Sequence, residues 1–181
     1  MAHAMELPRL LEALSTFEKR GMTFYRRFAA RFHAIPEASR LWTEMSNAEA
    51  GHFAVLTLAQ DLVQMGHHPG EPLQEITLAS LHEMEERLAA IETQGEAPDL
   101  TLAQAVHLAL AWEEDELPRV LALLPALPPQ ARGRILSGVF AEASLHYDCL
   151  KTLAELAGAA SFEERIHLLR RRVTEADASL S

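Results

Sequence analysis

Residues 42–59, WTEMSNAEAGHFAVLTLA, place a glutamate and a histidine in a row that otherwise suits the core side of a helix. Steps of three and four residues, the spacing of one helix face, connect Trp42, Met45, Glu49, His52, Leu56 and Ala59. A carboxylate in such a buried row is costly unless it is paired or bound to a metal ion. The stretch therefore predicts a core helix whose Glu49 and His52 need a partner inside the protein.

Three further segments repeat this pattern. Their polar interruptions are Glu18 between Leu11 and Phe28, Glu113 and Glu116 between Leu102 and Leu123, and Glu142 with His146 between Ile135 and Leu153. Four such rows meeting in one core would concentrate the carboxylates at one place. Because oxygen-rich sites with one histidine per metal suit iron or manganese, the pattern predicts a helical bundle around a dinuclear metal site.

The composition favours an all-α protein with a single core. The chain has 181 residues, of which 49% are hydrophobic and only 6% aromatic. It is rich in Leu, Ala and Glu, which are good helix formers, and no segment shows the alternating pattern of a strand.

Prolines, glycines and capping residues mark the expected helix ends. We expect helices from near Pro8 to before Pro36, from about Pro36 to Met65, around Leu78 to Thr93, after the turn GEAPD, from roughly Pro129 to Ala157, and from Ser161 onward. Asp99 or Thr101 would cap the helix after the turn, and Ser161 with Glu164 would form a capping box. Residues 1–160 would then form a four-helix bundle with one long crossover containing a short helix, and residues 161–181 a C-terminal helix and tail.

Charge and cysteine usage narrow the partners and the compartment. The net charge of −10 argues against nucleic acid or an anionic membrane surface as a partner. No apolar run is long enough to cross a membrane, and no secretory signal is evident, so a cytoplasmic location is expected. The single Cys149 suits a reducing compartment and excludes a four-cysteine metal site within this chain.

The two halves of the chain look like copies of one unit. Glu18 precedes Glu49 by 31 residues, and Glu113 precedes Glu142 by 29. Each half consists of a helix with a core glutamate followed by a helix with a core glutamate and a histidine. A long segment, about residues 66–98, joins the halves, as in bundles with one long crossover.

Several short motifs resemble the rubrerythrin branch of the ferritin-like superfamily. They are EKRGMTFY at residues 18–25, AEAGH at residues 48–52, and AVHLALAWE at residues 105–113, with Glu116 following three residues later. The resemblance covers roughly residues 8–157. It implies a ferritin-like four-helix bundle and a site for two iron ions, with manganese or zinc as possible substitutes.

The resemblance also implies a role for each polar residue in the rows. The metal ligands would be Glu18, Glu49, His52, Glu113, Glu116, Glu142 and His146. Glu18 and His52 would serve one ion, Glu142 and His146 the other, and Glu49 and Glu113 would bridge them. Tyr25, on the row of Glu18, would lie beside the site as a hydrogen-bond donor to a ligand.

Two features depart from the family pattern. Glu142 and His146 are four residues apart instead of three, and Ala143 stands where the family has its glutamate. Four residues still make one helical turn and a π-bulge could absorb the extra residue; alternatively, the second metal position has lost its normal geometry. Because one cysteine cannot build the rubredoxin-type iron domain of many rubrerythrins, turnover would need an external electron donor.

Three classes of function remain open from the sequence. The first is an oxidoreductase that reduces hydrogen peroxide or O2 with ferrous iron and an external electron donor. The second is a non-catalytic protein that binds, stores or senses iron. The third is a helical interaction protein with a vestigial metal site. Ferritin-like domains commonly pair, so a homodimer is possible in each case.

Overall fold

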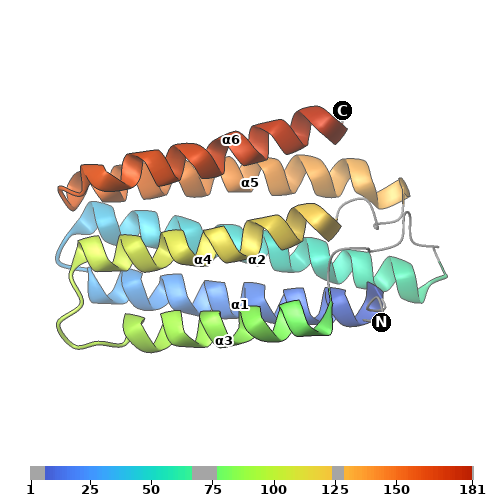
Figure 1. Ribbon diagram of the computed structural model, residues 1–181, viewed down its shortest axis with the longest axis horizontal. Helices are drawn as coiled ribbons and strands as arrows, with labels where there is room; N and C mark the ends of the chain where they lie inside the picture. Colours follow the sequence, from blue (N-terminus) through green and yellow to red (C-terminus); the bar gives the residue numbers. More distant parts are fainter. Residues whose placement is uncertain (1–6, 67–76, 124–128, 181) are drawn as a thin grey trace.

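The protein is described by a computed structural model that covers residues 7–66, 77–123 and 129–180 (Figure 1). Within these ranges, the side chains of residues 78, 117–123, 129–142 and 176–180 are not among those described. The main helices are α1 (Leu7–Arg31), α2 (Pro36–Gln64), α3 (Leu78–Gly95), α4 (Leu102–Leu123), α5 (Pro129–Leu156) and α6 (Glu163–Leu180). No strand occurs in the described ranges, so the predicted all-α class is confirmed.

Four of these helices close into a ring of contacts. Helix α1 packs against α2, α2 against α5, and α5 against α4. The ring closes between α4 and α1, where Trp112 stacks on Phe24 with the ring centroids 5.0 Å apart. The core between these helices therefore receives side chains from both halves of the sequence.

The other two helices lie outside this ring. Helix α3 runs beside α1 and α4, and α6 lies along α5 (Figure 1). Arg20 of α1 holds α3 through two hydrogen bonds to Glu92, of 2.8 and 3.0 Å. Helix α6 adds apolar side chains to the same core, namely Ile166, Leu169 and Val173.

The helix ends follow local sequence signals. Pro36 begins α2, where its fixed φ suits the first turn and its missing N–H costs nothing. Thr101 is the cap of α4, because its hydroxyl accepts from the backbone N–H of Gln104 while the Gln104 side chain accepts from the N–H of Thr101. Of the two candidate caps, Thr101 is thus the one used.

Two glycines end the helices as expected. Gly66 after α2 has a φ of +87°, and Gly158 after α5 has a φ of +64°. At Gly158 the backbone N–H bonds to Glu155 and the next N–H bonds to Ala154, the paired bonds of a Schellman motif. A residue with a side chain would be strained in this left-handed conformation.

The start of the last helix differs from the prediction. Residues Ala160–Phe162 form a 3₁₀ turn, and α6 begins at Glu163. Ser161 therefore lies inside the turn rather than at the cap, so the predicted capping box with Glu164 is wrong there. A different capping box, between Thr77 and Ser80, begins α3.

None of the described helices combines the length and the apolarity needed to cross a bilayer. The predicted loop at residues 66–72 lies, apart from Gly66, outside the described residues.

Leu88 tests whether α3 is an integral part of the core. Its side chain is completely buried, so Leu88→Ala should lower the free energy of unfolding by roughly 2–5 kcal/mol. The matched control is Leu58→Ala on α2, where the leucine is 47% exposed and the loss should stay within roughly 1 kcal/mol. Urea denaturation of both variants makes the comparison, and equal losses would show that α3 is not packed as described.

Candidate metal centre

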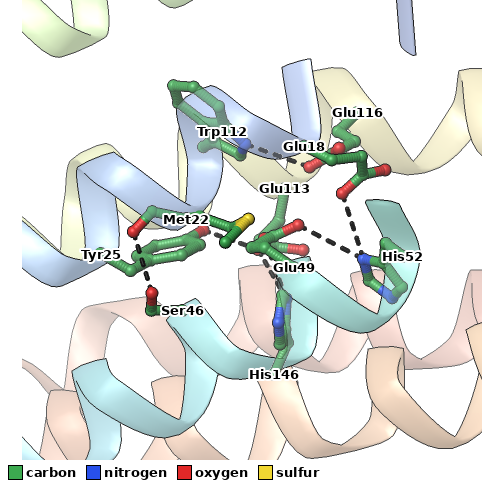
Figure 2. A network of polar contacts seen from close by, with 10 residues as sticks. All are labelled: Glu18, Met22, Tyr25, Ser46, Glu49, His52, Trp112, Glu113, Glu116 and His146. Atoms are coloured by element: carbon green, nitrogen blue, oxygen red, sulfur yellow. Dashed lines mark hydrogen bonds and ion pairs between the residues drawn. The ribbon is translucent and has the colours of Figure 1, made fainter. Parts of the chain in front are cut away.

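The four helices of the ring each direct polar side chains to one place in the core (Figure 2). Helix α1 supplies Glu18, α2 supplies Glu49 and His52, α4 supplies Glu113 and Glu116, and α5 supplies His146. All are buried except His52, whose side chain is 13% exposed. The glutamates that the sequence placed on the core faces of the helices therefore converge. This holds for each of them whose side chain is described.

These side chains form two groups that could each hold a metal ion. One consists of Glu18, Glu49 and His52, and the other of Glu49, Glu113 and His146. Within each group the potential ligand atoms lie within 4.8 Å of one another. Glu49 belongs to both groups, so a single carboxylate lies between the two positions.

Both histidines turn their Nδ1 atoms toward the carboxylates. The Nδ1 atom of His52 lies 3.3 Å from Oε2 of Glu49 and 3.4 Å from Oε2 of Glu18. The Nδ1 atom of His146 lies 2.8 Å from Oε1 of Glu113 and 3.8 Å from Oε1 of Glu49. The cluster therefore brings carboxylate oxygens and two imidazole nitrogens together.

Buried carboxylate oxygens that accept no hydrogen bond indicate that this donor set suits a cation. Among the described atoms, Oε2 of Glu18 and Oε1 of Glu49 are buried and have no hydrogen-bond partner. A buried carboxylate oxygen in that state is costly, and a bound divalent ion would remove the cost. Mixed carboxylate and imidazole ligands suit iron, manganese and zinc.

Burial and the charge of a neighbouring carboxylate keep protons on the glutamates of the first group when no metal is bound. Burial, with the charge of Glu116, raises the pKa of Glu18 to about 7. Burial, with the charge of Glu18, raises the pKa of Glu49 to about 8. A metal ion binding here would displace these protons.

The second group is arranged differently. Burial alone would raise the pKa of Glu113, but the charge of His146 and its hydrogen bond outweigh that effect and lower the pKa. For His146, burial lowers the pKa, but the charges of Glu113 and Glu49 outweigh burial and raise it. Glu113 and His146 thus form an ion pair in the metal-free protein.

Tyr25 is the hydrogen-bond donor to this pair. Its hydroxyl donates to Oε1 of Glu113 at 2.7 Å. Burial, with the charges of Glu113 and Glu49, raises the pKa of Tyr25 well above its usual value, so the hydroxyl keeps its proton. The helical spacing in the sequence put Tyr25 on the same face of α1 as Glu18. The hydrogen bond of Tyr25 is made to Glu113 of α4.

Glu116 occupies the edge of the cluster and belongs to neither group. Its Oε2 atom accepts a hydrogen bond of 3.0 Å from Nε1 of Trp112. Burial, with the charges of Glu49 and Glu113, raises its pKa well above the usual range. The spacing of four residues on one helix is the sequence signal that could have indicated the bond between Trp112 and Glu116.

Two further predictions from the sequence stay predictions. We expected Glu49 and Glu113 to bridge the ions; Glu49 belongs to both groups and Glu113 to the second. Glu142 lies in α5, and its side chain is outside those described, so its role stays a prediction. Ala143, three residues before His146, is buried and supplies no ligand atom.

Comparison of the chain with protein-family models, curated proteins and solved structures finds no match. The geometry and chemistry of the site are therefore the basis for inferring the function.

The raised pKa values predict how stability depends on pH without metal. Glu18 and Glu49 keep protons up to about pH 7 and 8 when folded, but lose them near pH 4.5 when unfolded. The folded state then binds more protons, so the free energy of unfolding should fall as the pH rises from about 5 to 8. The pKa values of His52 and His146 are also raised, which adds to the same trend. Urea denaturation of chelator-treated protein across this range measures it.

The double variant Glu18→Gln, Glu49→Gln is the control, because glutamine does not titrate. Its free energy of unfolding should fall less steeply over the same range. A wild-type stability that increased between pH 5 and 8 would contradict the assignment of protonated, buried glutamates.

Proposed function

We propose that the protein is a rubrerythrin-like dimetal carboxylate protein with a ferritin-like bundle. The closed ring of α1, α2, α5 and α4 supports this. So does the chain order, in which α3 comes between the pair α1 and α2 and the pair α4 and α5. Glutamates from α1, α2 and α4 and histidines from α2 and α5 meet inside the ring, as in dimetal carboxylate bundles. Two iron ions are the proposed cofactor, with manganese or zinc as substitutes.

The observation that carries the proposal is the position of Glu49. One buried carboxylate shared by two groups of three ligand residues is what two adjacent ions require. The charge balance also supports two metal ions. The carboxylates of Glu18, Glu49, Glu113 and Glu142 would supply four negative charges, which balance two divalent ions.

The proposed reaction is the reduction of hydrogen peroxide or O2. A pair of ferrous ions would supply the two electrons that convert one hydrogen peroxide, with two protons, to two waters. The electrons must come from an external donor, because the single Cys149 is buried and cannot form a second metal site of cysteines.

The chain itself would hold the ligands in place and exclude water. Tyr25 orients Glu113, and Trp112 orients Glu116, each through a hydrogen bond to a carboxylate oxygen. The fully buried rings of Tyr25 and Trp42 stack with centroids 5.9 Å apart and close the cluster on one side. His52 is the most exposed member of the two groups, with a side chain that is 13% exposed.

Iron binding without turnover is the second candidate. The observation that favours it is Ala143, a buried residue that supplies no ligand atom to the second group from the turn before His146. A weaker second position would favour storing or sensing iron over reaction with peroxide.

Metal content after anaerobic loading with ferrous iron tests the proposal. The wild type should bind two irons per chain, and Glu49→Gln should lose both, because this residue belongs to both groups. Glu37→Gln, an exposed glutamate on the same helix, is the matched control and should bind two. One hydrogen peroxide should then oxidise the two ferrous ions of each chain, as followed by absorbance.

The outcomes separate the candidates. Two irons that react with neither peroxide nor O2 would favour storage or sensing. One iron per chain would mean that a single position is functional and would contradict the dinuclear proposal. No stoichiometric iron would leave a helical bundle with a vestigial site.

Tyr25→Phe tests the role of the hydroxyl. The change removes the hydrogen bond to Glu113 and should weaken metal binding roughly 10–100-fold at the second group. Tyr147→Phe is the control, because its buried hydroxyl has no hydrogen-bond partner among the described residues. Zinc titration with a competing chelator measures both, and equal affinities in the two variants would contradict the role of Tyr25.

A further inference from the structure

The cluster contains a close contact that no ligand assignment explains. Gly21 of α1 faces Glu49 of α2, and a Cβ atom at position 21 would lie 3.2 Å from Cδ, 3.3 Å from Cγ and 3.4 Å from Oε1 of Glu49. The distances to Cδ and Cγ are shorter than ordinary van der Waals contacts. The carboxylate of Glu49 thus occupies the space that any larger residue at position 21 would need.

Helices α1 and α2 are tied together on both sides of this contact. One residue after Gly21, the backbone oxygen of Met22 accepts a hydrogen bond of 2.9 Å from Oγ of Ser46 (Figure 2). On the other side, Glu18 faces His52 at 3.4 Å. Because these contacts fix the distance between the helices, an added methyl group would have to move the Glu49 side chain.

Glu49 has little freedom to move without loss. Its Oε2 atom faces His52 at 3.3 Å, and its Oε1 atom faces His146 at 3.8 Å. A shift of a few tenths of an ångström would change both groups, since metal–ligand distances tolerate only about 0.2 Å. The absence of a side chain at Gly21 therefore affects the geometry of both metal positions.

We propose that Gly21 is a positioning residue, whose missing side chain sets the location of the carboxylate shared by the two metal positions. The inference rests on the proposed function, because it assigns Gly21 a role in that metal site. It predicts that Gly21→Ala weakens metal binding at both positions.

Cobalt titration of Gly21→Ala tests the proposal. Bound Co²⁺ has visible absorption bands that depend on the geometry of its ligands, so the titration reports stoichiometry, affinity and geometry without turnover. We expect Gly21→Ala to bind Co²⁺ roughly 10–100-fold more weakly than the wild type, with altered bands. Far-UV circular dichroism should remain that of a folded helical protein.

Gly95→Ala is the matched control. A Cβ atom at position 95 would meet Cε2 of Phe24 at 3.1 Å, so the same substitution makes an equally close contact, but with a core ring. This variant should bind two Co²⁺ ions with the wild-type spectrum. Equal weakening in both glycine variants would indicate a general packing effect and overturn the proposal.

A second variant keeps the test independent of folding. Glu49→Asp shortens the side chain and withdraws it from position 21. In the Gly21→Ala background it should therefore weaken Co²⁺ binding by a smaller factor than it does in the wild type. Equal factors in the two backgrounds would overturn the role of Gly21.

The results also distinguish this inference from the proposed function. A wild type that binds two Co²⁺ ions, together with an unchanged Gly21→Ala, would overturn the inference and leave the dimetal site intact. A wild type that binds no Co²⁺ would overturn both.

Discussion

The burial of Glu49 is the constraint on which the rest of the site depends. A completely buried carboxylate must be protonated, paired or bound to a metal ion. Here it lies beside a second buried carboxylate, Glu18, whose charge adds to the effect of burial and raises the pKa of Glu49 to about 8. Two cations would relieve this repulsion and bind the buried oxygens that accept no hydrogen bond. On the proposed function, metal binding would therefore stabilise the bundle.

Much of the fold follows from periodicity in the sequence. Helical spacing alone predicted that the core faces of α1, α2 and α4 carry Glu18, Glu49 and Glu113, because a residue's face depends only on its place in the repeat. Proline and glycine gave the ends of α2 and α5 to within a residue or two, since their backbone restrictions are local. The convergence of the glutamates was also predictable, because each would be costly to bury alone.

Contacts between helices could not be predicted in the same way. The hydrogen bond from Tyr25 to Glu113 and the contact of Gly21 with Glu49 depend on the separation and register of packed helices, which spacing within one helix does not fix. The bridging role predicted for Glu113 stays a prediction, and of the two groups this residue belongs to the second. The predicted cap of α6 was wrong because Ser161 lies in a 3₁₀ turn, and the helix begins two residues later, at Glu163.

The central claim is that two metal ions share Glu49. Anomalous diffraction at the iron edge, from crystals grown from anaerobically iron-loaded protein, tests it most directly. The account predicts two peaks, one among Glu18, Glu49 and His52 and the other among Glu49, Glu113 and His146. A single peak, or peaks that lie away from Glu49, would contradict it.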